Sequence, residues 1–161
     1  MDVALVNSGG LRNSLPAGPV SMGDVLAVLP FNNYLVVADM PGSALLAALE
    51  HGVSDYGQDK GRFLQVAGLT YAFDPNRPAG QCIIAARVAD KNGQWRSLDP
   101  AAVYRVVTVD YIAGGGDGFE ALKGLPWRET GLVFSDVLAE YMRNGSPLAP
   151  RLEGRVELIG N

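Results

Sequence analysis

Two glycine-rich segments carry the side chains of this chain that could do chemistry. Residues 7–12 read NSGGLR after a short apolar run, and residues 114–119 read GGGDGF after the most β-branched run of the sequence. Glycine permits backbone conformations with positive φ and lets a ligand approach the main chain. Each segment adds a charged side chain that could bind a ligand, Arg12 in the first and Asp117 in the second. The two segments therefore predict one pocket built from distant parts of the chain.

Catalytic groups are scarce in this sequence. It has one histidine, His51, and one cysteine, Cys82, which we interpret as a helix-end residue and a core residue. Hydrolysis needs a nucleophile with a base, or a metal ion that generates hydroxide. No zinc, nucleophile-elbow or phosphate-loop motif occurs, and no pair of acidic residues stands out by its spacing. We predict a binding surface without catalytic or metal-ligating residues, so the isolated chain should be inactive as a hydrolase.

Length and composition are typical of one globular domain. The chain has 161 residues, of which 48% are hydrophobic and 19% charged. A net charge of −4 with scattered basic residues argues against a nucleic-acid partner, which needs clustered Lys and Arg. No apolar run approaches the roughly 20 residues of a membrane helix, and no export signal is visible.

Apolar patterns predict the elements that position the two glycine segments. Strands are expected at 3–6, 34–40, 63–73, 83–88, 103–109 and 155–159, and helices at 22–29, 44–53 and 136–143, with Ser21 and Ser135 as N-caps. Helices and strands interleave, but tight turns join several strands, which favours a mixed sheet. The predicted fold is a single α/β (α+β) domain over residues 1–161, with a mixed β-sheet flanked by helices.

Five stretches of the chain resemble the C-terminal domain of the 5′-nucleotidase family, and most of all the bacterial UDP-sugar hydrolase/5′-nucleotidase type. They are residues 7–12, 28–33 (VLPFNN), 63–68 (FLQVAG), 104–109 and 111–119. They keep the order of the family and extend over nearly the whole chain. The resemblance implies the fold of that domain and a role in substrate recognition.

The resemblance also implies roles for five residues. Phe31 and Tyr111 would stack on the two faces of a nucleotide base, and Asp117 would accept hydrogen bonds from the ribose hydroxyls. Arg12 would lie near the ribose and phosphate, and Asn7 would contact the base or line the same pocket. The residue types suit these roles, since aromatic rings stack on flat bases and a carboxylate only accepts hydrogen bonds. Tyr111 stands where many members have Phe, so its hydroxyl needs water or a partner.

The family further implies a partner domain that this sequence does not show. A separate N-terminal metallophosphoesterase domain, with two divalent metal ions and the catalytic histidine, would cut the phosphate ester of an AMP-like nucleotide or a UDP-sugar. The abrupt first strand predicts that the chain was cut from something longer, and the family suggests a periplasmic or extracellular place. Two alternatives stay open: a stand-alone nucleoside-binding module without catalysis, and a structural or dimerising domain.

Overall fold

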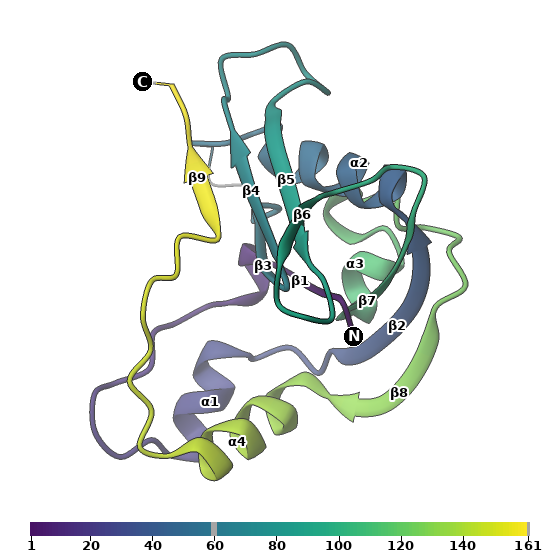
Figure 1. The fold of residues 1–161 in the computed structure, drawn as a ribbon. Coiled ribbons are helices and arrows are strands. Elements are labelled where there is room, and N and C mark those ends of the chain that lie inside the picture. Colours follow the sequence, from purple (N-terminus) through teal and green to yellow (C-terminus); the bar gives the residue numbers. More distant parts are fainter. Residues whose placement is uncertain (59–60, 161) are drawn as a thin grey trace.

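The strands of the protein form two mixed sheets, as a computed structural model that describes residues 1–58 and 61–160 shows. The five-stranded sheet has the order β3-β1-β7-β2-β8, and the four-stranded sheet has the order β6-β5-β4-β9 (Figure 1). The strands are β1 (Val3–Asn7), β2 (Tyr34–Pro41), β3 (Leu64–Ala67), β4 (Leu69–Phe73), β5 (Ile83–Ala89), β6 (Trp95–Ser97), β7 (Val103–Val109), β8 (Arg128–Val133) and β9 (Val156–Leu158). The helices are α1 (Met22–Val28), α2 (Gly42–Val53), α3 (Asp110–Ala113) and α4 (Phe134–Gly145), with short 3-10 turns η1 (Ser8–Gly10) and η2 (Gly116–Gly118). The predicted α/β class with mixed strand pairing is confirmed.

The pairing of β1 with β7 brings the two glycine segments together. These strands are parallel, with Val3 opposite Val106 and Ala4 opposite Val107. The carboxyl ends of parallel neighbours lie at the same edge of a sheet. The segment after β1 and the segment after β7 therefore leave the sheet side by side.

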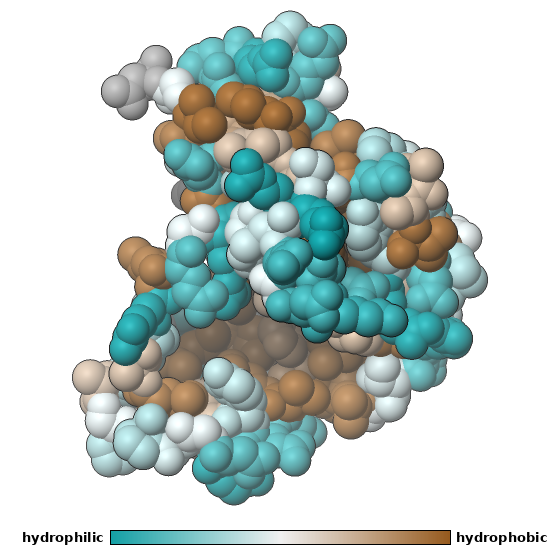
Figure 2. Space-filling model, in the orientation of Figure 1, coloured by the Kyte–Doolittle hydropathy of each residue, from teal (hydrophilic) through white to brown (hydrophobic). Residues whose placement is uncertain are grey.

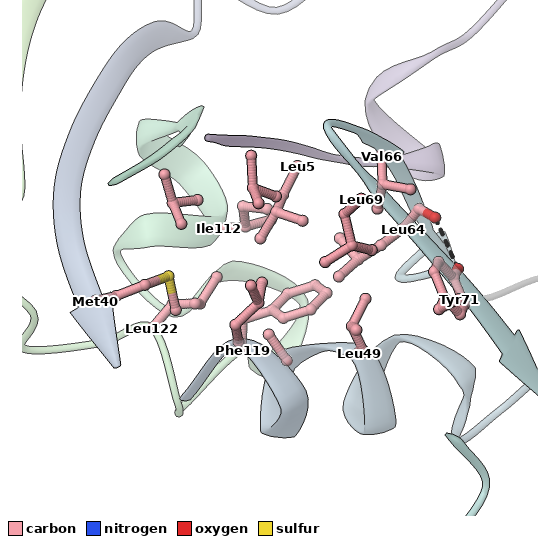
Figure 3. Close-up of a cluster of buried hydrophobic side chains, with 14 of the residues drawn as sticks. Leu5, Met40, Leu49, Leu64, Val66, Leu69, Tyr71, Ile112, Phe119 and Leu122 are labelled. Carbon is pink, nitrogen blue, oxygen red and sulfur yellow. Dashed lines mark hydrogen bonds between the residues drawn. The ribbon is translucent and has the colours of Figure 1, made fainter. Parts of the chain in front are cut away.

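The hydrophobic core anchors the second of these segments. Figure 3 shows Phe119 and Leu122 among apolar side chains from β1, β3, β4 and α2. Phe119 is 1% exposed and Leu122 is fully buried. In the same core the hydroxyl of Tyr71 donates to the carbonyl oxygen of Leu64 over 2.9 Å. A loop that ends in two core side chains has little freedom to move away from the sheet.

Helices α1 and α4 pack against one another beside the sheets (Figure 1). A capping box begins α1, since Ser21 Oγ accepts from the Asp24 amide and an Asp24 carboxylate oxygen accepts from the Ser21 amide. The Ser21 hydroxyl also donates to the Asp24 carboxylate over 2.6 Å, and this hydrogen bond, followed by the one from the Ser21 amide, lowers the pKa of Asp24. Figure 2 shows apolar surface lining a hollow between this helix pair and the strands. Phe31 follows α1 and lies near the carboxyl ends of β1 and β7, since it lines one pocket with Asn7 and Val109.

The strand predicted at residues 63–73 is in fact two strands in different sheets. Gly68 has a φ of +70° and separates β3 from β4. A Cβ atom at this position would lie 2.0 Å from the carbonyl oxygen of Asp2. The buried positions shift by one residue at this break, from Leu64 and Val66 in β3 to Leu69, Tyr71 and Phe73 in β4, and the prediction overlooked this shift.

Several other boundaries differ from the prediction. Helix α4 begins at Phe134, and Ser135 is a buried residue of its first turn rather than its cap. The short exposed strand β6, the Gly131-containing strand β8 and the one-turn helix α3 were missed. Cys82 is buried, as predicted. Within the described residues, no helix is both long and apolar enough to span a membrane.

Substituting the glycine between β3 and β4 should destabilise the fold. Gly68→Ala combines left-handed strain with a backbone clash and should lower the free energy of unfolding by about 3–4 kcal/mol. Gly80→Ala is the matched control, because Gly80 has a φ of +80° but nothing within 4 Å of an added Cβ. The control should lose only about 1–2 kcal/mol in urea denaturation. Equal losses for the two variants would contradict the proposed clash.

Candidate functional site

The second glycine segment holds Asp117 in an uncommon backbone conformation. Asp117 has φ 53° and ψ 16°, in the left-handed region, within the turn η2. Aspartate tolerates this region better than most residues but is still disfavoured there. Glycine is required next to it, because a Cβ on Gly116 would lie 2.7 Å from the ring of Tyr111. The segment thus packs closely against Tyr111 and presents one carboxylate.

Two side chains from other elements fix the carboxylate of Asp117. The side-chain amide of Asn7, at the end of β1, donates to Oδ2 over 2.7 Å. The hydroxyl of Tyr111, on α3, donates to Oδ1 over 2.8 Å. An ionised carboxylate has about four acceptor positions, so each oxygen keeps capacity for a further donor. The hydroxyl of Tyr111, which the sequence left in need of a partner, therefore has one in Asp117.

This hydrogen bond changes the acid–base behaviour of Tyr111. The pKa of Tyr111 is raised, first because its hydroxyl donates to Asp117, and then through partial burial and the negative charge of that carboxylate. The residue nevertheless remains 48% exposed. The phenol is therefore neutral near pH 7 and offers an apolar ring face to solvent in a fixed orientation.

Phe31 lies beside Asn7 at a narrow pocket. The pocket has a volume of about 10 Å³, with Val109 and Phe134 also in its lining, which is room for about one water molecule. Phe31 is 50% exposed, whereas Asn7 is only 3% exposed. The Asn7 Oδ1 atom is buried and has no hydrogen-bond partner within the described part of the chain. A buried acceptor without a partner is unfavourable, so a donor from water or a ligand would stabilise it.

Arg12 lies at the margin of the site. Its backbone amide donates to the Val28 carbonyl over 2.9 Å, and its guanidinium donates to the Gly9 carbonyl over 3.4 Å. No hydrogen bond connects it to the other four predicted residues, all of which the structure describes. The structure therefore joins Asn7, Tyr111 and Asp117 directly, places Phe31 next to Asn7, and leaves the Arg12 side chain exposed.

His51 also contacts the site, although the sequence indicated only a helix-end residue. It does lie in the last turn of α2, but its Nε2 is 2.9 Å from the carbonyl oxygen of Asp117. Its ring also meets Phe119 edge to face, with centroids 4.8 Å apart. No local pattern signals this contact, because it depends on how α2 packs against a segment 66 residues later. Among the described residues, no three His, Cys, Asp or Glu side chains form a group that could hold a metal ion.

Comparisons with known proteins identify the family. The 5′-nucleotidase, C-terminal domain family matches residues 1–124. The crystal structure of a 5′-nucleotidase precursor from Thermus thermophilus is 44% identical with a TM-score of 0.95, over 99% of this chain and 32% of that chain. A 5′-nucleotidase-related protein of Glossina morsitans morsitans is 36% identical over 98% of this chain and 29% of its own length. The trifunctional nucleotide phosphoesterase protein YfkN of Bacillus subtilis is 34% identical over 98% of this chain and 11% of its own.

The chain belongs to the 5′-nucleotidase C-terminal domain family, which confirms the resemblance found in its sequence. It spans between 11% and 32% of the length of these three relatives. The five predicted site residues lie within the matched part of the chain, since Asn7, Arg12, Phe31, Tyr111 and Asp117 all precede residue 124.

Removing the charge of Asp117 should shift the titration of Tyr111. Asp117→Asn should bring the pKa of Tyr111 back toward its ordinary value of 10.0, because a neutral amide stabilises the neutral phenol less. The pKa is raised in the folded state, so this interaction stabilises the fold below the unfolded pKa and is lost as pH rises through the folded pKa. NMR of the assigned Tyr111 ring measures the change.

Asp110→Asn is the matched control for this titration. The Asp110 carboxylate accepts a hydrogen bond from the backbone amide of Tyr111 over 2.9 Å and makes none with the Tyr111 hydroxyl. The control should move the pKa of Tyr111 less than Asp117→Asn does. A pKa that Asp117→Asn leaves unchanged would show that the Tyr111–Asp117 hydrogen bond is absent in solution.

Proposed function

We propose that this chain is the nucleotide-recognition domain of a metal-dependent 5′-nucleotidase or UDP-sugar hydrolase. It would hold the base and ribose of the substrate while a separate domain hydrolyses the phosphate ester. The observation that carries the proposal is the Asp117 carboxylate, which Asn7 and Tyr111 fix beside half-exposed aromatic rings. Membership of the family and the greater length of the relatives support it.

The two aromatic side chains suit a flat base. Phe31 and Tyr111 are each about half exposed, so a ligand can cover their ring faces. Stacking of a base on an aromatic ring contributes about 1–3 kcal/mol and depends little on which base it is. The orientation of the Tyr111 ring is set in advance by its hydrogen bond and by its contact with Gly116, so little order is lost on binding.

The carboxylate of Asp117 suits a vicinal diol. It accepts from Asn7 on one oxygen and from Tyr111 on the other, which leaves acceptor positions for the two ribose hydroxyls. Hydrogen bonds to a charged group contribute about 1.5–3 kcal/mol each. A ribose bound here would therefore be distinguished from a sugar that lacks both hydroxyls.

The remaining two residues would complete the contacts to the substrate. The exposed guanidinium of Arg12 is always charged and can bind a phosphate in bidentate fashion. The unpaired Oδ1 of Asn7 would accept a donor from the base or from an ordered water. AMP-like nucleotides and UDP-sugars share the base–ribose portion that this site would bind, so both substrate classes fit the proposal.

Hydrolysis would take place on the other domain of a longer protein. Its metallophosphoesterase centre would hold the two divalent metal ions and supply the activated water. The residues of this chain would orient the substrate, so that its phosphate points away from the aromatic rings toward that centre. Positioning of this kind can contribute several kcal/mol to catalysis without any chemistry in the recognising domain.

Asp117→Asn should weaken ribonucleoside binding selectively. The substitution keeps size and shape, and asparagine also tolerates a positive φ, so the fold should be preserved. We expect about 1–2 kcal/mol weaker binding of adenosine, because charge-assisted hydrogen bonds to the ribose are lost. Binding of 2′,3′-dideoxyadenosine should change much less, since it lacks both hydroxyls. Titrations of both ligands against both proteins form a double-mutant cycle.

A thermal melt of the variant is the control for folding. If adenosine and dideoxyadenosine lose equal affinity, Asp117 does not bind the ribose. If the melting temperature falls strongly, Asp117 is primarily a structural residue of the turn. In a longer protein with its catalytic domain, the same substitution should mainly raise KM.

A further inference from the structure

His51 connects helix α2 to the segment that carries Asp117. Its Nε2 atom lies 2.9 Å from the Asp117 carbonyl oxygen. A carbonyl oxygen only accepts, so Nε2 carries the proton and donates, which sets the Nε2–H tautomer of the ring. The hydrogen bond is between a side chain of one element and the main chain of another, so it restrains the backbone of Asp117 directly.

The ring of His51 is itself held in place. It meets the edge of Phe119 at an interplanar angle of 74°, and Phe119 is 1% exposed in the core. A Cβ on Gly118 would lie 3.1 Å from the imidazole, so a larger residue there would crowd the ring. The imidazole therefore fits between the core and the turn, with its donor aimed at one carbonyl.

Asp117 needs such a restraint more than an ordinary residue does. Its φ of 53° lies in a region that residues with a side chain disfavour, so the turn would relax without external contacts. Asn7 and Tyr111 hold the carboxylate, whereas His51 holds the carbonyl of the same residue. Three contacts from three different elements thus fix the side-chain carboxylate and the main-chain carbonyl of Asp117.

We infer that His51 is a positioning residue for ligand binding, which fixes the Asp117 carboxylate in the orientation that accepts the two ribose hydroxyls. His51 itself touches no ligand. Its importance for binding rests on the proposed function, but its action on Asp117 can be observed without any ligand. Preference for a ribose over a dideoxyribose then depends on a side chain at the end of α2.

Two variants separate the hydrogen bond from the ring packing. His51→Gln offers an amide N–H donor at a reach similar to that of Nε2 and removes the ring. His51→Phe keeps a ring against Phe119 and removes the donor. We expect His51→Phe to lower the affinity ratio of adenosine over 2′,3′-dideoxyadenosine by about three- to tenfold, and His51→Gln to keep it within about twofold. Thermal melts of both variants show whether each is folded.

NMR of the ligand-free protein gives a second readout. The side-chain amide signals of Asn7, which report its bond to Asp117, should move in His51→Phe and stay in His51→Gln. In the unmodified protein, ring ¹⁵N shifts should show the Nε2–H tautomer of His51. That observation requires no variant to fold and no ligand to bind.

Several outcomes would overturn the inference. One is a folded His51→Phe protein with an unchanged affinity ratio and unchanged Asn7 signals. Another is an equal loss in both variants, which would assign the effect to ring packing. An Nδ1–H tautomer in the unmodified protein would exclude the hydrogen bond. If the unmodified protein bound neither nucleoside, the proposed function would fail, and the Asn7 signals would still decide whether His51 positions Asp117.

Discussion

The parallel pairing of β1 with β7 brings together the two segments that carry Asn7 and Asp117. Because the two strands run in the same direction, their carboxyl ends deliver Asn7 and the segment around Asp117 to one edge of the sheet. The resulting hydrogen bond joins residues 110 positions apart in the chain. Without that pairing, the two glycine segments would be unrelated loops. With it, Asn7, Tyr111 and Asp117 form one hydrogen-bonded polar cluster, next to the exposed residue Phe31.

The core and the polar cluster support one another. The turn around Asp117 has an unfavourable backbone conformation, and it persists because Phe119 and Leu122 anchor the following residues in the core. Asn7, Tyr111 and His51 satisfy the polar atoms of Asp117 from three directions. A carboxylate held in this way loses little freedom when a ligand binds, which is the physical advantage of a preformed site.

Features that depend on local sequence were predicted well. The Ser21 cap of α1, the β-branched strand β7 and the two glycine segments each follow from residues close together in the chain. The break at Gly68 was missed although the alternation shifts there, and the approach of the Asp2 carbonyl, which leaves no room for a side chain, is visible only in the folded structure. Ser135 was assigned as a cap because it suits that role, but α4 begins at Phe134, two residues before the predicted start, and buries Ser135. The contact of His51 with Asp117 likewise depends on tertiary packing, so no sequence motif indicates it.

An NMR titration of the isotopically labelled chain with adenosine shows whether this site binds a nucleoside. Two stacking contacts and one charged contact contribute favourable free energy, and the loss of freedom on association offsets much of it. The resulting dissociation constant should be on the order of high micromolar to millimolar. Binding at the proposed site should give saturable shifts of the Phe31 and Tyr111 ring signals and of the Asn7 side-chain amide signals. A titration to the solubility limit that leaves both rings unchanged, or that saturates at residues elsewhere, would contradict it.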